Sequence, residues 1–298
     1  MRFTRRGFLM SGAVVAGASA GCRSMLAGEF KGPTHTDAVL KLSCQVARIP
    51  GKELSEKLAR MEEWGFDGVE LQRDLFGNEK KYQDALKNTK LKVSAWCGAP
   101  GCADGQLVSE VVERRGSALE KIKRSLATAG EFGAVAVIFV PAFNPQTTLD
   151  NREIRKILVD KLPELGQCAE KAGTHLVMEP LNRKEAFFLR QVADGAAIAR
   201  DCQSPGIGVM GDFYHMAIEE TSDLGAFISG GSRLHHVHLA SRTRVLPGQD
   251  DRQFVEGFRG LKWIGYRDYC SFECRVQGDA MVEIPKSMAF LRQQWKMA

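Results

Sequence analysis

The 298-residue sequence lacks the motifs that mark several common classes of protein. It has no G-x-G-x-x-G turn and no P-loop, which argues against an open, doubly wound sheet that binds nucleotides. None of its eight cysteines belongs to a pair of Cys-x-x-Cys motifs, so a structural zinc site is not expected. No low-complexity segment and no second domain are visible. These absences leave a single globular domain as the expected organisation of the body of the chain.

The body of the chain also has little excess of charge. The formal net charge is +5, but three of the basic residues, Arg2, Arg5 and Arg6, lie within the first 21 positions. Without that segment, 38 basic side chains face 36 acidic ones. A nearly neutral body offers no basic stripe for a phosphate backbone, so we expect no nucleic-acid partner.

The N-terminus has the parts of an export signal. Arg5-Arg6-Gly7-Phe8-Leu9 precedes a weakly apolar run over residues 11–20, which is too short to span a bilayer and contains the small residues Ala18-Ser19-Ala20. The paired arginines followed by Phe-Leu resemble a twin-arginine signal. We therefore expect residues 1–36 to be a signal peptide and linker read by the twin-arginine export machinery. The protein would then be periplasmic, with its folded domain over residues 37–298; a disordered basic tail is the alternative.

Three cysteines carry expectations of their own. Ser19-Ala20-Gly21-Cys22 resembles a lipoprotein box, although Ser stands where Leu is usual, so a lipid anchor at Cys22 stays open. Cys97 and Cys102 flank a glycine-rich turn, and a disulfide between them is a further option in an oxidising compartment.

Apolar runs alternate with helical patterns along the body of the chain. We expect strands at residues 40–46, 66–71, 91–96, 134–140, 176–178, 207–211, 234–237 and 269–272. Helical patterns follow at residues 54–64, 82–86, 107–132, 154–172, 191–202, 222–229, 261–266 and 284–295. Eight strand–helix repeats in about 260 residues predict an α/β fold, a single-domain (β/α)8 TIM barrel.

The last four expected strands each lead to a residue that can bind a metal. These residues are Glu179, Asp212, His238 and Glu273, separated by 33, 26 and 35 positions, roughly one strand–helix unit each. The carboxyl ends of barrel strands meet at the active-site face, so the four side chains are expected to converge on one divalent cation. One such carboxylate alone would more often cap a loop. A mixed set of oxygen and nitrogen ligands favours Mn²⁺, with Co²⁺, Mg²⁺ or Zn²⁺ as other options.

The three histidines of the seventh strand are expected to differ in role. His236 and His238 are two positions apart and therefore face the same side of the strand. His238 is nearer the carboxyl end and is the expected ligand, whereas His236 should lie one layer deeper in a hydrogen-bonded position. His235 should point outward and is given no function.

The residues around these strand ends carry a resemblance. Together the segments look like the xylose isomerase-like superfamily of TIM barrels, in the branch of sugar (phosphate) isomerases and epimerases, which includes ketose 3-epimerases and hydroxypyruvate isomerases. The segments are Glu179-Pro180-Leu181-Asn182-Arg183, Asp212-Phe213-Tyr214-His215, His236-Val237-His238 and Ser271-Phe272-Glu273, with Gly65 to Leu71 and Gly133 to Pro141 matching as well. The resemblance covers roughly residues 38–295; it is specific for the superfamily and does not select a substrate.

The resemblance implies roles for individual residues. In that family two glutamates, an aspartate and a histidine hold one divalent ion, often Mn²⁺, which implies the four ligands named above. It also implies that His215 and Arg244 contact substrate oxygens. Arg183 would bind a substrate oxygen or a phosphate, or else form a surface ion pair. Glu70, at the end of the second strand, would contact substrate or cap a loop.

The expected chemistry is proton transfer next to a carbonyl through a metal-bound enediolate. A divalent ion that binds the carbonyl and hydroxyl oxygens makes the neighbouring C–H acidic enough to be removed. Glu179 and Glu273 would act as base and acid. Return of the proton to the opposite face is epimerisation, and return to the neighbouring carbon is isomerisation. The sequence therefore predicts a carbohydrate isomerase or epimerase, with a free sugar or keto-sugar favoured because an exported enzyme meets few sugar phosphates.

Two other functions remain open at this point. A metal-dependent lyase, such as a dehydratase of a keto acid or keto-sugar, shares the enolate step. An exported barrel that binds sugar without turnover would retain the same ligands. A three-zinc DNA-repair enzyme of the same superfamily is disfavoured, because it needs histidines where Glu70-Leu71-Gln72 and Trp96-Cys97 stand. Whether the chain forms a homo-oligomer is not determined by the sequence.

Overall fold

The computed structural model describes residues 37–298, which form a barrel of eight parallel strands. Its strands are β1 Lys41–Cys44, β2 Gly68–Leu71, β3 Lys92–Trp96, β4 Ala136–Phe139, β5 His175–Met178, β6 Ile207–Asp212, β7 Leu234–Leu239 and β8 Tyr269–Phe272. The predicted signal peptide and Cys22 lie outside the described residues. Within residues 37–298, none of the helices combines the length and the apolar character needed to cross a membrane.

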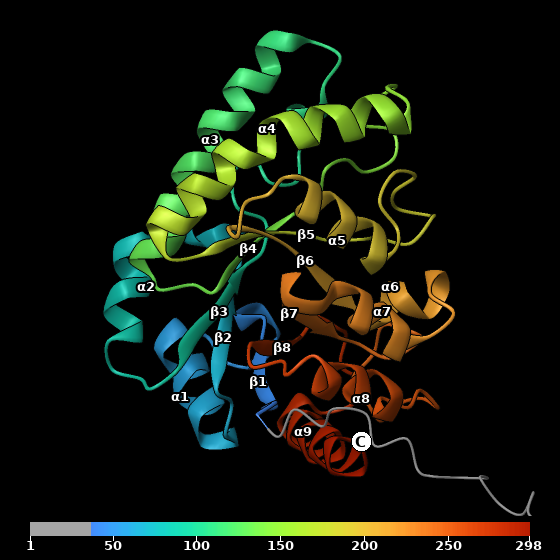
Figure 1. Cartoon of the computed structure of the whole chain (residues 1–298). Coiled ribbons are helices and arrows are strands. Elements are labelled where there is room, and N and C mark those ends of the chain that lie inside the picture. The colour runs from blue at the N-terminus through green and yellow to red at the C-terminus, as the bar shows by residue number, and fades with distance from the viewer. Residues whose placement is uncertain (1–36) are drawn as a thin grey trace, which may run out of the picture. The chain divides into compact units, whose positions relative to one another are not determined.

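The strands pair in the order of the chain, and β8 returns to β1 (Figure 1). Between β1 and β2 the ladder is reduced to an isolated parallel bridge that joins Gln45 to Glu70, and the backbone N–H of Asp67 donates to Leu42 O at 2.8 Å. The barrel is therefore nearly closed at this seam. The predicted (β/α)8 architecture is confirmed.

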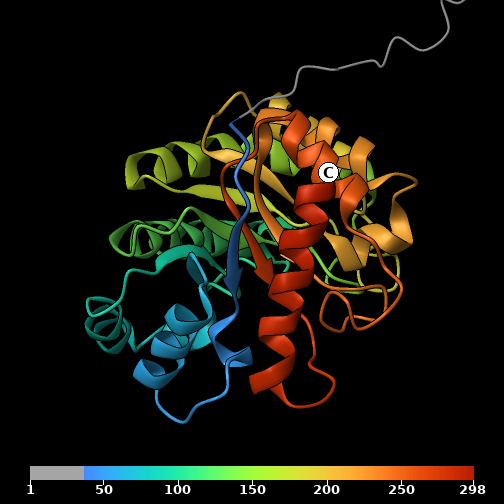
Figure 2. The same cartoon turned by 90° about the horizontal axis from the view of Figure 1, so that it is seen from below.

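The helices surround the strands (Figure 1). They are α1 Leu54–Trp64, α2 Glu79–Leu86, α3 Val112–Glu131, α4 Asn151–Ala172, α5 Val192–Asp201, α6 Phe213–Glu219, α7 Asp223–Gly230, α8 Val255–Trp263 and α9 Ala280–Met297. The C-terminal helix α9, drawn in red, lies beside β1, drawn in blue (Figure 2). Arg292 of α9 donates to Gly65 O at the end of α1, which ties the last helix to the first.

Two helix predictions were displaced. The expected helix over residues 261–266 begins earlier, at Val255, because Phe254 and Phe258 are buried against Phe213, with ring centroids 4.8 and 6.1 Å away. The expected helix over residues 107–132 is split into a short 3-10 turn, Gln106–Val108, and α3. Helix α6, directly after β6, was not predicted.

Alternation along the strands decides which residues face the barrel axis. A small apolar cluster of Ala95, Ala136, Ile138, Val177 and Met210 fills the interior and is separate from the larger core. Because side chains repeat every two residues along a strand, the positions two after Val177 and Met210 point the same way. The chain therefore delivers its strand-end carboxylates to the axis of the barrel, directly above this interior cluster.

The optional disulfide is absent, because Cys97 and Cys102 are both free. Cys102 is fully buried in the core outside the barrel, whereas Cys97 packs against the interior cluster. The two thiols thus pack in different clusters, and the optional bond between them is not formed.

Candidate metal centre

Four side chains from four neighbouring strands converge at the carboxyl end of the barrel. One ligand atom from each of Glu179, Asp212, His238 and Glu273 lies within 4.8 Å of every other. His238 Nδ1 is 3.1 Å from Glu273 Oε2, 3.5 Å from Glu179 Oε1 and 4.0 Å from Asp212 Oδ2. The convergence expected from the sequence is thus present in the fold.

The end of β6 shows how the backbone orients one of these carboxylates. Asp212 is the N-cap of α6, and its Oδ1 accepts a hydrogen bond from the backbone N–H of Tyr214 at 2.7 Å. This bond leaves Oδ2 directed toward the other ligands. Gly211 before it has no room for a side chain, since a Cβ there would lie 2.7 Å from Phe227. The tight junction of β6 and α6 therefore needs glycine on its outer side and aspartate on its inner side.

Polar atoms at this centre lack hydrogen-bond partners. Asp212 Oδ2 and His238 Nδ1 are both buried and both unpaired. Buried polar atoms without partners are rare in folded proteins, and here they face a cluster of carboxylates. Carboxylate oxygens with one imidazole nitrogen are a donor set that divalent cations such as Mn²⁺ accept. The residues present therefore fit a divalent metal ion.

The electrostatics of the cluster favour a cation as well. Burial, together with the neighbouring charges of Glu273 and Glu179, raises the pKa of Asp212 to about 7. Burial also raises the pKa of Glu179. Burial opposes ionisation of Glu273 too, but His238 and Arg244 hold its pKa at about 2. Without a bound cation the cluster cannot keep all its carboxylates ionised at low cost, and a divalent ion would remove that conflict.

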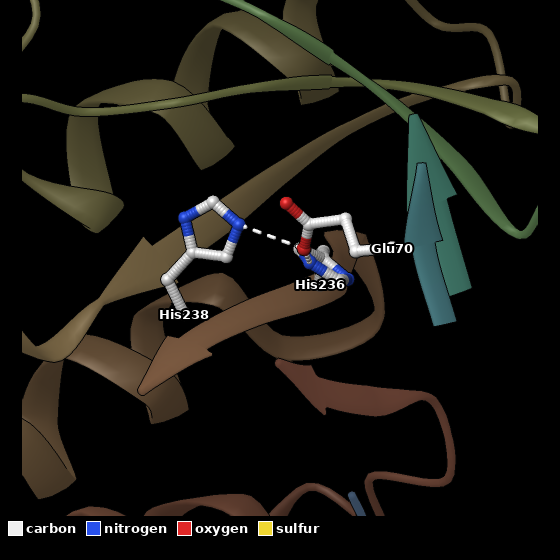
Figure 3. A group of neighbouring side chains, drawn as sticks. All are labelled: Glu70, His236 and His238. Atoms are coloured by element: carbon white, nitrogen blue, oxygen red, sulfur yellow. Dashed lines mark hydrogen bonds and ion pairs between the residues drawn. The ribbon is translucent and has the colours of Figure 1, made fainter. Parts of the chain in front are cut away.

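A second layer of side chains lies on the other side of His238. Glu70 reaches from β2 to both inward histidines of β7 (Figure 3). Its Oε2 lies 3.0 Å from His238 Nε2 and 2.9 Å from His236 Nε2, and all three side chains are fully buried. The two histidines hold the pKa of Glu70 well below its usual range despite burial, so Glu70 is an anion that accepts both bonds. Burial opposes protonation of His238, but Glu70 and Glu273 raise its pKa, so Nδ1 also carries a proton in the metal-free protein. Because Nε2 is the donor to Glu70, Nδ1 is the nitrogen that would release its proton and bind a metal.

Gln45 joins the two layers. Its Nε2 donates to Glu70 Oε1 at 3.0 Å and to Glu273 Oε1 at 2.9 Å. Gln45 comes from the seam where β1 meets β2, so barrel closure places it. Gln45 was not among the predicted site residues. The signal that could have found it is its place two positions after Ser43, on the same face of the alternating first strand.

A small pocket of about 140 Å³ lies above the ligands. Glu179, Glu273, His215 and Arg244 line it, together with Phe143 and Leu181. The predicted substrate contacts His215 and Arg244 therefore share a pocket with the two glutamates. The buried ligands Asp212 and His238 lie beneath, with 1% and 0% of their surface exposed.

His215 is held as a neutral hydrogen-bond donor. Burial and Arg244 lower its pKa to about 3. The backbone N–H of Asn182 donates to Nδ1 at 3.1 Å, so in the neutral ring the proton sits on Nε2. That Nε2 is buried without a hydrogen-bond partner, 3.5 Å from Asp212 Oδ2. An oxygen of a bound molecule could accept the hydrogen bond that Nε2 is able to donate.

Arg244 covers the same pocket from the loop after β7. Its Nη2 lies 2.8 Å from Glu273 Oε2, and its guanidinium lies 4.7 Å from the centre of the Tyr214 ring. The residue has a φ of 58°, a left-handed conformation that is uncommon outside glycine. The fold thus supports a strained backbone where Arg244 reaches over the site, as functional residues often require.

Two residues proposed as substrate contacts have other partners in this structure. Glu70 lies in the deeper layer, and neither it nor Arg183 is among the described residues that line the pocket. Arg183 forms an ion pair with Glu219, with Nε 2.8 Å from Oε1, which is the surface ion pair that the sequence left open. The expected deeper position of His236 is confirmed, and His235 points away from the axis toward Asp268.

Comparisons with known proteins agree with this geometry. The sequence profile described as "Xylose isomerase-like TIM barrel" matches residues 58–294. A 3-dehydro-D-guloside 4-epimerase of Escherichia coli (strain K12) is 29% identical over 265 residues, covering 85% of this chain and 99% of the relative. An L-ribulose 3-epimerase of Mesorhizobium japonicum is 29% identical over 252 residues, covering 82% of each. The crystal structure of a 3-keto-D-glucoside 4-epimerase from E. coli matches with a TM-score of 0.77 at 30% identity, covering 86% of this chain and all of that one.

Proposed function

The chain belongs to the xylose isomerase-like TIM barrel family, and we propose that it is a divalent-metal-dependent carbohydrate epimerase. It inverts a carbon next to a carbonyl by removing and returning a proton. The observation that carries this proposal is the placement of two glutamates, Glu179 and Glu273, both in the ligand cluster and in the wall of one small pocket. The similar proteins named above are sugar epimerases, which favours epimerisation over isomerisation.

The two glutamates perform the proton transfer. Glu179 follows β5 and Glu273 follows β8, three strands apart around the ring, so their carboxylates approach a molecule in the pocket from different sides. The carboxylate that is ionised removes the proton from the carbon, and the other, which must be protonated when the substrate binds, delivers its proton to the opposite face. Exchange with solvent then restores the starting protonation of both. A divalent ion held by Glu179, Asp212, His238 and Glu273 would supply Lewis-acid stabilisation of the negative charge that develops on the substrate oxygens.

His215 and Arg244 orient the sugar. The pKa of the protonated form of His215 is low, so the ring is neutral. A neutral imidazole holds its remaining proton tightly, so the Nε2–H donates a hydrogen bond to a substrate oxygen without transferring that proton. Arg244 contributes a permanent positive charge above the carboxylates. Phe143 and Leu181 contribute apolar walls that limit the entry of water.

We propose Mn²⁺ as the resident ion. Three carboxylates and one imidazole suit Mn²⁺, Co²⁺ or Mg²⁺, whereas no thiolate stands in the ligand set to favour Zn²⁺. Titration of the metal-free protein with each ion, followed by calorimetry, tests the choice. Tighter binding of Mg²⁺ than of Mn²⁺ would contradict it.

We also propose that residues 1–36 direct export to the periplasm through the twin-arginine machinery. The support is Arg5-Arg6 followed by Phe8-Leu9. Cell fractionation of the full chain and of a double variant, Arg5→Lys with Arg6→Lys, tests it; equal periplasmic amounts of both would contradict it. Labelling with a radioactive fatty acid, with Cys22→Ser as control, tests the lipid anchor.

The function itself is tested by solvent deuterium exchange. Protein with Mn²⁺ is incubated in D₂O with a panel of ketoses and keto-glycosides and followed by NMR. We expect deuterium next to the carbonyl together with the inverted product, lost on addition of EDTA and in Glu273→Gln. Release of water or a leaving group in place of inversion would identify a lyase. Binding of sugars with no exchange would identify a sugar-binding protein.

A further inference from the structure

Gln45 has no part in the proton transfer described above, yet the fold places it between the two layers of the site. It directly follows β1, the strand that lies between β8 and β2. Its backbone N–H donates to Phe272 O at 3.3 Å, next to Glu273, and its backbone forms the isolated parallel bridge with Glu70. The main chain therefore holds Gln45 beside one metal-ligand candidate and beside the carboxylate that supports His238.

The side chain of Gln45 makes the same connection with hydrogen bonds. Its Nε2 donates to Glu70 Oε1 at 3.0 Å and to Glu273 Oε1 at 2.9 Å. A primary amide has two N–H groups on one nitrogen, so it can serve two acceptors at once. Only 1% of the residue is exposed, so the amide is shielded from water. Both carboxylates therefore obtain their donor from the protein.

The amide also has a defined orientation. Its Oε1 accepts from Arg48 Nε at 3.4 Å. The reverse orientation would place an oxygen, which has no proton to donate, against both carboxylates. Glutamate at this position would add a third carboxylate, methionine would donate no hydrogen bond, and asparagine is shorter by one methylene group. Among side chains of similar shape, glutamine is therefore the one that joins the two carboxylates.

The two carboxylates depend on this amide to different extents. The side chain of Glu70 is fully buried, so packing holds it in place. The side chain of Glu273 is 15% exposed and borders the pocket, so it has room to rotate when its Oε1 loses a donor. Its Oε2 lies 2.8 Å from Arg244 Nη2 and 3.1 Å from His238 Nδ1. The amide thus fixes which oxygen of Glu273 faces the other ligands.

We propose, resting on the metal-dependent function above, that Gln45 is a positioning residue that holds Glu273 with Oε2 among the metal ligands. It also ties this carboxylate to Glu70, and so to the support of His238. Gln45 is not among the described residues that line the pocket. Its contribution is therefore to metal affinity and to turnover, and not to binding of the sugar. Because Gln45 belongs to the seam between β1 and β2, the metal centre is complete only when the barrel is closed.

The first experiment compares Gln45→Met with the wild type. Methionine has a similar length and removes both donated hydrogen bonds. We expect the affinity for Mn²⁺, measured by calorimetry on the metal-free protein, to fall by about tenfold, as for other partners that orient metal ligands. At saturating Mn²⁺, kcat for deuterium exchange should fall by about tenfold while KM stays within about twofold, because no interaction with bound sugar is removed.

Gln72→Met is the matched control. Gln72 directly follows β2 on the other side of the same seam, and its Oε1 accepts from the backbone N–H of Ala47 at 3.2 Å. The control thus makes the same change of side chain and removes a hydrogen bond of the seam. Its affinity for Mn²⁺ and its kcat should stay at the wild-type values. Gln45→Asn keeps a polar amide and is the milder change for folding; because it is too short to reach both carboxylates, it should behave like Gln45→Met.

Bound Co²⁺ provides a measurement that a loss of stability alone does not change. The visible absorption of Co²⁺ depends on the number and arrangement of its ligands. At saturating Co²⁺, the spectrum of Gln45→Met should differ from that of the wild type, because Glu273 no longer presents a fixed oxygen. The spectrum of Gln72→Met should match the wild type. A Gln45→Met protein that is less stable but has the wild-type spectrum and the wild-type affinity for Mn²⁺ would overturn the positioning role.

The remaining outcomes separate this inference from the function on which it rests. Equal losses in Gln45→Met and Gln72→Met would overturn it, because the seam and not the amide would then be responsible. A large rise in KM with unchanged kcat would place Gln45 in contact with the sugar and would overturn it as well. Absence of exchange by the wild type on every sugar, together with the expected loss of Mn²⁺ affinity in Gln45→Met, would overturn the epimerase and leave the positioning role intact.

Discussion

The two sides of the His238 ring differ in how its nitrogens are paired. In the deeper layer every oxygen of Glu70 accepts a hydrogen bond, from His236, His238 or Gln45. In the upper layer Asp212 Oδ2 and the Nδ1 of His238 have no hydrogen-bond partner, although both are buried. The same histidine thus has one satisfied nitrogen and one unsatisfied nitrogen. Missing pairs alone do not mark the ligand side, because the Nδ1 of His236 in the deeper layer is also buried without a partner. The comparison teaches that the ligand side is where an unpaired imidazole nitrogen faces several carboxylates, and the supporting side is where the other nitrogen of the same ring is bound.

The largest effect is expected from breaking the upper layer at Glu273. Glu273→Gln removes a carboxylate that serves both as ligand and in proton transfer, so kcat should fall by about 10²- to 10⁴-fold. Initial rates of deuterium exchange provide the measurement. Glu220→Gln is the matched control, since Glu220 is a half-buried glutamate that is in neither the ligand cluster nor the lining of the pocket. Comparable losses in both variants would show that the upper layer has no special role.

A smaller effect is expected from the deeper layer. Glu70→Gln replaces an anion that accepts from two imidazoles with an amide that has a donor of its own. His238 then loses the partner that fixes its tautomer, and metal affinity should fall by about 10- to 100-fold. Calorimetric titration with Mn²⁺ measures this. In Glu219→Gln, another buried carboxylate but one bound to Arg183, the affinity should stay at the wild-type value. Wild-type affinity in Glu70→Gln would mean that the deeper layer is only packing.

The conflict among the upper carboxylates should be visible as pH-dependent stability of the metal-free protein. Burial and its neighbours raise the pKa of Asp212 to about 7 from an ordinary 3.8. Between pH 3.8 and about 7, Asp212 is protonated in the folded state and ionised in the unfolded state. The free energy of unfolding therefore falls as pH rises through this range. Asp212→Asn removes the effect, and its gain in unfolding free energy over wild type should grow with pH to roughly 4 kcal/mol near neutral pH. Denaturant titrations across this range in EDTA measure the difference, and a gain that is flat with pH would contradict the account.

The smallest effect is expected outside both layers. Arg183 is paired with Glu219 and is absent from the residues that line the pocket, so Arg183→Ala should change kcat/KM by less than about twofold. From the sequence alone, Arg183 could either contact substrate or form a surface ion pair. A tenfold rise in KM would restore that role and would show that the pocket reaches further than the described side chains indicate.

Most of the fold could be predicted because it depends on local patterns. The two-residue period of the strands and the spacing of Glu179, Asp212, His238 and Glu273 are both readable along the chain. Helix α8 was misplaced because its start depends on the packing of Phe254 against Phe213, a contact between segments far apart in sequence.

The site was predictable in its upper layer and, in the deeper layer, at His236 but not at Glu70 or Gln45. Strand ends converge in any such barrel, which is why the four ligands could be predicted together. The position of Glu70 depends on the nearly closed seam between β1 and β2, where Gln45 meets it, and on two histidines more than 160 positions later. Nothing local in the second strand distinguishes a carboxylate that meets substrate from one that supports a ligand.

The most direct test of the metal centre is anomalous X-ray diffraction from crystals grown with Mn²⁺. The account predicts one strong anomalous peak among Glu179, Asp212, His238 and Glu273, within bonding distance of His238 Nδ1. Glu70, His236 and His238 form a rival group of potential ligands on the other side of the same ring. A peak among those three residues, or no peak at either position, would contradict the division of the site into a metal-binding layer and a supporting one.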